Sequence, residues 1–175
     1  MRAIAIGLAT LALAAGLAGG ALGAGKKAAP PPPPEVTRIS AGAFPISTSV
    51  KVPAGSTLVF VSGLTPDVTA PGLSGADPAS YGDTATQTVN VIKKIQAALQ
   101  AQGMDLKDIT MMHVYLVGDP AKGGKLDFAG MMAGYTKYFG TADQPNKPSR
   151  TTVQVAALAN PAIMVEIDVV AAKAN

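Results

Sequence analysis

Residues 148–158 read PSRTTVQVAAL and residues 162–170 read AIMVEIDVV, and these two segments decide how the chain folds. Both are rich in Val, Ile and Thr, which favour β-strands, and Asn160-Pro161 separates them. Because side chains alternate between the two faces of a strand, Glu166 and Asp168 share one face of the second segment. The connection is short, which predicts that the two strands are neighbours in one sheet.

Arg150 opens the first of these strands, directly after Pro148-Ser149. Its guanidinium group is a planar, permanently charged fork that fits a carboxylate or a phosphate. A second interpretation needs no ligand, because most charged strand residues face water. From the spacing alone, Arg150 and Glu166 are then surface residues of a two-stranded edge, and this interpretation is the more common outcome.

Together the two segments resemble the C-terminal signature of the RidA/YjgF family, the reactive-intermediate imine deaminases, also called the endoribonuclease L-PSP family. The family pattern is P-A-R-S-x-V-x-V-A-x-L, followed by a strand in which hydrophobic residues alternate with Glu. The resemblance extends from Arg38 to Ala172. It implies an α+β fold, a chorismate-mutase-like mixed sheet with two helices on one face. It also implies a homotrimer whose sheets form a central barrel, with sites in the clefts between subunits.

The rest of the chain predicts elements that agree with such a fold. Residues 84–102 have apolar side chains at helical spacing, with a capping box at Thr84 and Gln87 and a stop at Gly103. A second amphipathic helix is predicted at residues 127–139. The chain has no third helix to cover the other sheet face, so we expect oligomerisation. The remaining strands are predicted at residues 49–52 and 57–62, joined as a hairpin that the family also has, and at residues 109–117.

The N-terminus has the pattern of a secretory signal peptide. Arg2 supplies a positive charge, residues 4–17 are almost wholly apolar, and Ala21-Leu22-Gly23 offers a small-x-small cleavage site. Cleavage would release an exported protein, periplasmic or secreted, with no stable membrane insertion. The predicted organisation is a signal peptide at 1–24, a Lys- and Pro-rich linker at 25–35 and a RidA-like domain at 36–175.

Composition excludes several kinds of site. The chain has no Cys, which excludes disulfides, thiolate catalysis and Cys-ligated metals, and its single His makes a zinc site improbable. The formal net charge is only +3, with no basic run beyond Lys26-Lys27, so no nucleic-acid partner is expected. This near-neutral surface and the lack of a His pair argue against ribonuclease activity. His113 is expected to be structural or exposed, and the Met residues are expected to pack.

The resemblance also implies roles for single residues. Arg150 matches the family Arg that grips the carboxylate of a 2-imino or 2-aminoacrylate acid. Glu166 matches the Glu that holds the attacking water. The backbone at Thr152 would meet the same carboxylate, and Ser62 and Gly63 would line the cleft.

Two positions depart from the family pattern. Ile46 replaces the Tyr of Gly-Pro-Tyr-Ser, because this chain reads Phe44-Pro45-Ile46-Ser47. Met132 stands where the second helix often carries Asn, three residues before Tyr135. Each change exchanges a hydrogen-bonding group for an apolar one. They predict a substrate-binding cleft that prefers larger, more hydrophobic substrates, or one that has lost turnover.

The function that the resemblance implies is imine/enamine deamination, which hydrolyses reactive 2-imino acids to 2-oxo acids and ammonia. Imines hydrolyse unaided, so holding the carboxylate and orienting one water supply the rate gain without metal or cofactor. An alternative stays open: a non-catalytic trimer of the same fold that binds small carboxylates or acts in protein interaction. Ile46 and Met132 favour the alternative, whereas Arg150 together with Glu166 favours the enzyme.

Overall fold

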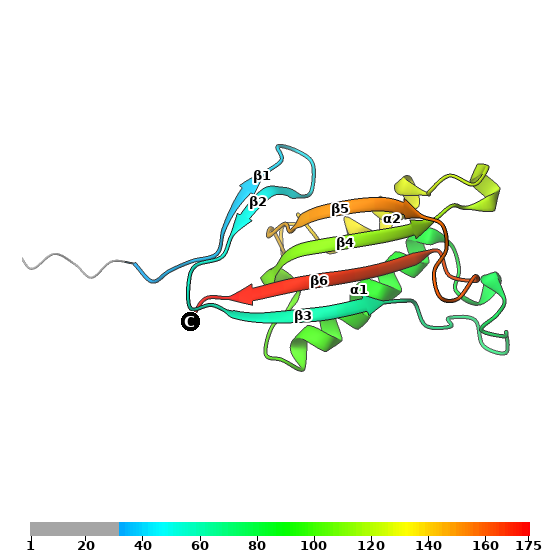
Figure 1. Cartoon of the computed structure of the whole chain (residues 1–175), viewed down its shortest axis with the longest axis horizontal. Helices are drawn as coiled ribbons and strands as arrows, with labels where there is room; N and C mark the ends of the chain where they lie inside the picture. Colours follow the sequence, from blue (N-terminus) through cyan, green and yellow to red (C-terminus); the bar gives the residue numbers. More distant parts are fainter. Residues whose placement is uncertain (1–31) are drawn as a thin grey trace, which may run out of the picture. The chain divides into compact units, whose positions relative to one another are not determined.

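Six strands form one mixed sheet in the order β1-β2-β5-β4-β6-β3 (Figure 1). The computed structural model describes residues 32–175, so the predicted signal peptide and most of the predicted linker lie outside the described residues. Within residues 32–175, no helix has both the length and the apolar composition needed to span a bilayer. The strands are β1 (Thr37–Ser40), β2 (Ser47–Lys51), β3 (Thr57–Leu64), β4 (Ile109–Val117), β5 (Ser149–Val155) and β6 (Val165–Lys173).

Strand β4 lies inside the sheet and organises it. It pairs in parallel with β5, where Met112 lies opposite Arg150, and antiparallel with β6, where Met112 lies opposite Val169. Partners in register share a face, so the alternating burial along β4 extends to both neighbours. One face of these three strands is buried and the other is open.

Helices α1 (Thr84–Gln100) and α2 (Phe128–Tyr135) both cover the buried face, which confirms the predicted α+β class with two helices on one side (Figure 1). Each helix connects two parallel strands, as in a βαβ unit. Their apolar sides pack on the sheet. The core contains Val91, Ile92, Ile95 and Leu99 of α1, Met131 and Tyr135 of α2, Met112, Val114 and Leu116 of β4, and Val165, Ile167 and Val169 of β6.

The prediction that the two C-terminal strands are neighbours is wrong, because β4 lies between β5 and β6. The residues between them, 156–164, are enough to cross one strand, which requires about 10 Å. In the central position, Val165, Ile167 and Val169 are buried on the face opposite Glu166 and Asp168, in agreement with the predicted alternation. The pattern identified the face of β6 correctly but not its neighbour.

The predicted hairpin of residues 49–62 is also wrong. Strand β2 pairs with β1, which the sequence analysis missed, and with β5 at a single position, Ser47 opposite Ser149. Strand β3 instead pairs with β6 at the far edge of the sheet. A Pro-Gly turn joins two strands without deciding whether they pair. Strand β1 escaped prediction because it has only four residues, most of them exposed and polar.

Helix α1 begins one residue earlier than the predicted capping box. Asp83 is the N-cap, and its carboxylate accepts a hydrogen bond of 2.8 Å from the Thr86 amide. Gln87 is fully buried and bridges two segments instead, donating to the Gly82 carbonyl and accepting from the Met164 amide. The stop near Gly103 is confirmed, with φ at +72° just after the helix.

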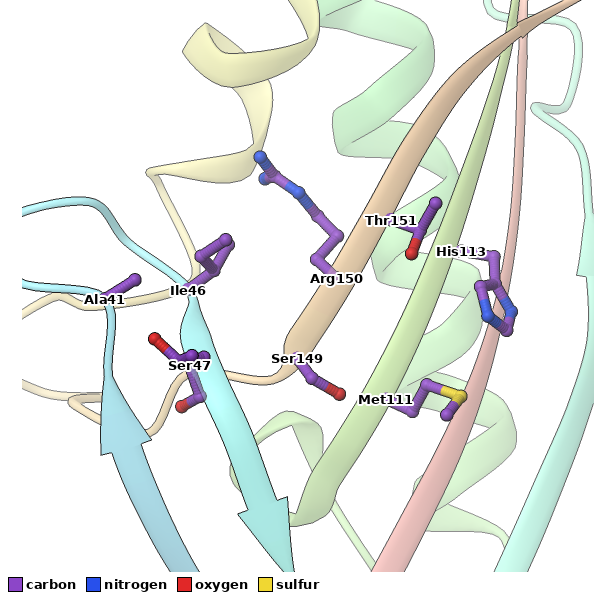
Figure 2. Close-up of a pocket in the computed structure, with 9 residues that line it drawn as sticks. Ala41, Ile46, Ser47, Met111, His113, Ser149, Arg150 and Thr151 are labelled. Atoms are coloured by element: carbon purple, nitrogen blue, oxygen red, sulfur yellow. The ribbon is translucent and has the colours of Figure 1, made fainter.

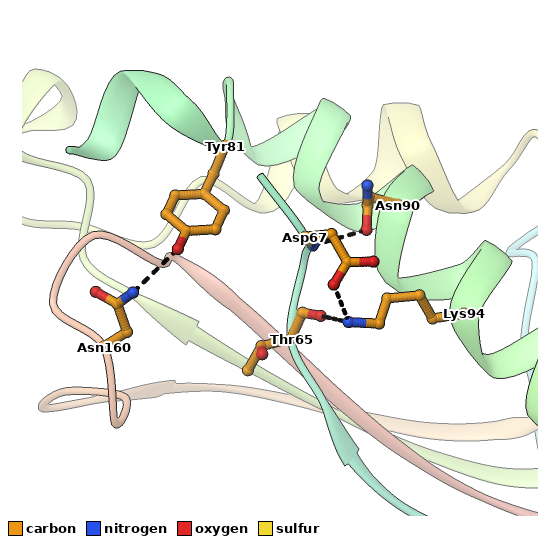
Figure 3. Close-up of polar contacts among 6 residues, drawn as sticks. All are labelled: Thr65, Asp67, Tyr81, Asn90, Lys94 and Asn160. Carbon is orange, nitrogen blue, oxygen red and sulfur yellow. Dashed lines mark hydrogen bonds and ion pairs between the residues drawn. The ribbon is translucent and has the colours of Figure 1, made fainter. Parts of the chain in front are cut away.

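The loop after β3 is held against α1 and against the turn that precedes β6 (Figure 3). Lys94 donates to the Thr65 carbonyl and pairs with Asp67 at 2.5 Å. Tyr81 donates to the Gly75 carbonyl, and Asn160 donates to the Tyr81 hydroxyl at 3.1 Å. Hydrogen bonds therefore hold the long predicted loop of residues 67–82 near both of its ends.

The other sheet face is open in the single chain. Phe60 of β3 is 72% exposed on this face, and Leu58, Met111 and Val153 are also exposed on it. An apolar hollow of about 440 Å³ is lined by Phe60, Leu58 and Met111 together with Val50, Val52 and Val170. This is the uncovered face that the sequence analysis expected.

Candidate active site

Arg150 points to the helix-covered side of the sheet, beneath α2. Its guanidinium carbon lies 4.3 Å from the centre of the Tyr135 ring, a cation–π contact. Its nitrogens lie 3.3 Å from the Met132 sulfur and 4.0 Å from the Met131 sulfur. Thioethers are weak acceptors. No carboxylate among residues 32–175 forms an ion pair with Arg150.

Burial lowers the pKa of Arg150, and the neighbouring Tyr135 ring partly opposes that shift. Burial also raises the pKa of Tyr135, and its hydroxyl donates a hydrogen bond of 2.9 Å to the Pro45 carbonyl. Tyr135 thus supports the guanidinium with its ring and fixes the loop before β2 with its hydroxyl. The Arg150 guanidinium is therefore a charged, half-buried group that lies against the buried Tyr135 ring.

A pocket of about 370 Å³ lies beside Arg150, where β2 and β5 separate (Figure 2). Ile46 and Ser47 line it from one side, and Arg150 and Thr151 line it from the other. Figure 2 shows the Arg150 side chain directed away from Thr151, in agreement with alternation along the strand. The backbone around Arg150 therefore lines a pocket on one side, while its guanidinium lies on the other.

Thr152 shares the helix-covered side with Arg150, because it lies opposite the buried Val114. Its hydroxyl oxygen is buried and has no hydrogen-bond partner among the described residues. An unpaired buried hydroxyl is unfavourable, so this position is consistent with a site that a ligand completes. The structure thus brings Arg150, Thr152, Ile46 and Met132 to one region.

Glu166, Ser62 and Gly63 form a second group on the open face. Glu166 lies opposite Tyr115 in β4. The pairing of β3 with β6 shifts register between Val61 and Leu64, which places Ser62 and Gly63 in a bulge beside Glu166. At Gly63 an added Cβ would collide with the Glu166 carboxylate, so only Gly allows this close approach.

The two groups do not meet within one chain. Arg150 belongs to the buried face with Met112, whereas Glu166 belongs to the open face with Tyr115. Strand β4 also separates their strands, which adds about 10 Å. A ligand the size of an amino acid cannot touch both side chains of the same chain.

The open face carries a further polar cluster next to Glu166. His113 and Asp168 form a hydrogen bond of 2.8 Å between Nδ1 and Oδ1. The neighbouring Asp168 raises the pKa of Tyr115, with Glu166 contributing a smaller effect in the same direction. His113 is partly exposed, and its pairing with Asp168 was not expected from the sequence.

Comparison with known families assigns this chain. The family model described as Endoribonuclease L-PSP matches residues 41–173. The chain belongs to the endoribonuclease L-PSP family. This confirms the RidA/YjgF resemblance seen in the sequence.

Individual members of the L-PSP family are moderately similar. A RutC family protein of Pyrococcus horikoshii is 36% identical over 92 residues, covering 53% of this chain and 64% of that protein, just under two thirds of its length. The 3-aminoacrylate deaminase RutC of Acinetobacter baylyi is 32% identical over 127 residues, covering 73% of this chain and 88% of that protein. The structure of Escherichia coli TdcF with bound serine has a TM-score of 0.52 at 27% identity, covering 70% of this chain and 85% of that one.

This L-PSP family chain departs from the family pattern close to Arg150. Met132 takes the place of the family Asn and presents its sulfur to the guanidinium. Ile46 takes the place of the family Tyr, packs partly against the core and lines the pocket. Both positions therefore lie near Arg150 with apolar groups, and their role in substrate binding stays a prediction.

Two aromatic residues near Arg150 were missed by the sequence analysis. The ring centres of Phe44 and Phe128 lie 5.8 and 5.9 Å from the guanidinium carbon. Phe128 and Tyr135 are seven residues apart, two helical turns, which places both on the side of α2 that meets Arg150. That spacing was a usable signal, whereas nothing in the sequence showed that Phe44 folds toward the same group.

Proposed function

We propose that this chain is an imine/enamine deaminase that converts 2-imino acids to 2-oxo acids and ammonia. The observation that carries the proposal is the environment of Arg150. Its half-buried guanidinium has rings and sulfurs around it but no carboxylate among the described residues. A buried cation without a counter-ion is unfavourable, and a substrate carboxylate would supply two charge-assisted hydrogen bonds.

Two relatives support the chemical class. One is a 3-aminoacrylate deaminase, and the other was solved with bound serine, a small amino acid that carries a carboxylate. In the proposed reaction, Glu166 orients a water and accepts its proton as the oxygen adds to the imine carbon. Glu166 then passes that proton to the imine nitrogen, which gives a carbinolamine. The proton of the carbinolamine hydroxyl moves to nitrogen as the C–N bond breaks, so ammonia leaves and the C=O bond of the 2-oxo acid forms.

The proposal requires a second copy of the chain, because Arg150 and Glu166 lie on opposite faces. We propose the homotrimer that the family resemblance implies, in which Glu166 and Gly63 of one subunit face Arg150 of the next. The exposed apolar side chains of the open face, Phe60 and Leu58 among them, support burial by another copy.

The direct test measures ammonia and 2-oxo acid released from freshly generated 2-imino acids. Arg150→Ala should lower kcat/KM by on the order of a hundredfold, and Arg150→Lys should retain little activity because it loses the fork. Glu166→Gln should lower kcat with little effect on KM. Lys51→Ala, an exposed strand residue, is the control and should match the wild type. Unchanged turnover in Arg150→Ala would overturn the proposal.

Subunit mixing tests the shared site. Chains with Arg150→Ala and chains with Glu166→Gln are each inactive in the proposal. After unfolding and refolding together, random assembly places an intact Arg150 beside an intact Glu166 in about a quarter of the sites. Recovery of about a quarter of wild-type activity is expected. No recovery from a correctly assembled mixture would place both residues in one chain's site, or remove one of them from it.

A second candidate function is binding of small carboxylates without turnover. Met132 favours it, since its sulfur already takes up one guanidinium nitrogen and cannot donate to a substrate. Calorimetry with pyruvate, together with the ammonia assay, distinguishes the two candidate functions. Binding that depends on Arg150 without ammonia release supports the binder.

We also propose export, with cleavage near Ala24, from the N-terminal pattern alone. Intact-mass analysis of the protein recovered from the producing cell's periplasm or medium should show an N-terminus at Ala24 or Gly25. Recovery of only the full-length chain in the cytosol would reject this proposal.

A further inference from the structure

Phe44 stands where the family pattern Gly-Pro-Tyr-Ser has its Gly, so this chain adds an aromatic ring at the site. The ring is 42% exposed and its centre lies 5.8 Å from the guanidinium carbon of Arg150. Phe128, at the start of α2, is 40% exposed with its centre 5.9 Å from the same carbon. Two partly exposed aromatic rings therefore flank one cation that has no counter-ion among residues 32–175.

The backbone that carries each ring is anchored. The loop before β2 is fixed by the hydrogen bond from Tyr135 to the Pro45 carbonyl and by that from the Ala41 amide to the Ile46 carbonyl, 3.1 Å long. Phe128 follows Asp127, the N-cap of α2. The backbone that carries both rings is thus ordered before a ligand arrives, which lowers the entropy lost on binding.

A carboxylate held in the guanidinium fork lies about 4 Å from the guanidinium carbon. The rest of a 2-imino acid then extends to the distance from the guanidinium carbon at which both ring centres lie. Aromatic rings prefer offset-stacked or edge-to-face partners, and such pairs are stronger than the buried area alone gives. An aryl group on the substrate fits these walls better than an alkyl group of the same size.

We infer that Phe44 and Phe128 form an aromatic clamp that selects 2-imino acids with an aryl side chain. The inference rests on the proposed function, since it assumes that Arg150 binds the substrate carboxylate. It goes beyond the general hydrophobic preference expected from Ile46 and Met132, because it predicts discrimination between an aromatic ring and a saturated ring of equal size.

The test uses three stable 2-oxo acids as product analogues: phenylpyruvate, its cyclohexyl analogue and pyruvate. Calorimetry with wild-type protein should show phenylpyruvate binding threefold to tenfold more tightly than the cyclohexyl analogue. Phe44→Leu and Phe128→Leu keep apolar bulk but remove a ring, so each should reduce that ratio, and the double variant should bring it close to one. Leu73→Ala, an exposed residue of the 67–82 loop, should leave the ratio unchanged. Circular dichroism checks that each variant folds.

The outcomes separate the clamp from the deaminase. The clamp is overturned if the wild type binds phenylpyruvate and the cyclohexyl analogue equally well, or if both substitutions leave the affinity ratio unchanged. Binding of pyruvate that depends on Arg150 would still support the carboxylate site in that case. A ratio that falls as expected, without ammonia from the matching imines, supports the clamp and rejects deamination. Binding of none of the three acids overturns both.

Discussion

Gly63 and Glu166 approach each other so closely that a Cβ at Gly63 would overlap the carboxylate and lie 2.9 Å from its Cδ. The obstructing atoms are the end of a flexible side chain, so Gly63→Ala can be accommodated if Glu166 rotates away. We expect the unfolding midpoint to stay within a few degrees and kcat for imine hydrolysis to fall at least tenfold. Thr57→Ala, an exposed residue at the start of the same strand, is the control for a change that leaves Glu166 in place. Full activity in Gly63→Ala would show that the orientation of Glu166 does not matter.

Phe60→Lys should break the proposed assembly. Phe60 is the most exposed large apolar residue of the open face, and a charge there would be buried between copies. Light scattering should show the wild type at three chain masses and the variant as single chains, with unchanged helical circular dichroism. Val68→Lys, an exposed apolar residue of the loop after β3, is the matched control and should remain assembled. A wild type that stays a single chain at micromolar concentration would contradict the trimer.

The sequence predicted the layers of this fold better than its connections. The face that Glu166 and Asp168 share followed from alternation, and the helices followed from apolar spacing. Strand order did not follow, because a sheet position depends on long-range pairing that a turn or a short link leaves open. For this reason β6 was placed beside β5, and β3 beside β2.

Met132→Asn should move the site toward the family pattern. An Asn amide can donate to a substrate and no longer presents sulfur to Arg150, so turnover of the imine derived from alanine should rise severalfold. The imine derived from leucine should gain less, since one methylene of lost apolar contact weakens binding by about 0.8 kcal/mol. Steady-state kinetics with both imines measures the ratio. Met132→Leu, which keeps the apolar character, should not shift it.

Asp83 should make part of the stability depend on pH. The hydrogen bond from the Thr86 amide lowers the pKa of Asp83 in the folded state. Its contribution is therefore fully present above the unfolded pKa, near 4, and is lost as pH falls through the lower folded pKa. Asp83→Ala should lower the free energy of unfolding at pH 7 by about 1 kcal/mol.

Asp83→Asn separates the cap from the charge. Asn also caps helices, so this variant should match the wild type at pH 7 within about 0.5 kcal/mol. It should lose less stability than the wild type between pH 5 and pH 3. Urea unfolding at one chain concentration measures all three proteins, and equal pH dependence in the wild type and Asp83→Asn would reject the assignment.

Residues of the candidate site could be predicted only where a local sequence motif or strand pattern identifies them. Arg150, Glu166 and Gly63 follow from a motif or a strand pattern. That Arg150 and Glu166 lie on opposite faces required the register of β4, which only the folded sheet supplies. Phe44 could not be found, because its contact with Arg150 depends on how Tyr135 holds the intervening loop.

Strand β2 joins the main sheet through one ladder position, Ser47 opposite Ser149. Few further bonds tie the β1–β2 hairpin to the core, among them those from Arg38 to the Lys107 and Ile109 carbonyls, so we expect it to open before the core unfolds. Its amides should exchange with deuterium well before those of β4 and β6. Since Phe44 and Ile46 lie on the segment that this unit carries, transient opening would remove one wall around Arg150 and let a bulky product leave. The rate of product release would then be set by the fraying of two short strands rather than by the stability of the whole domain.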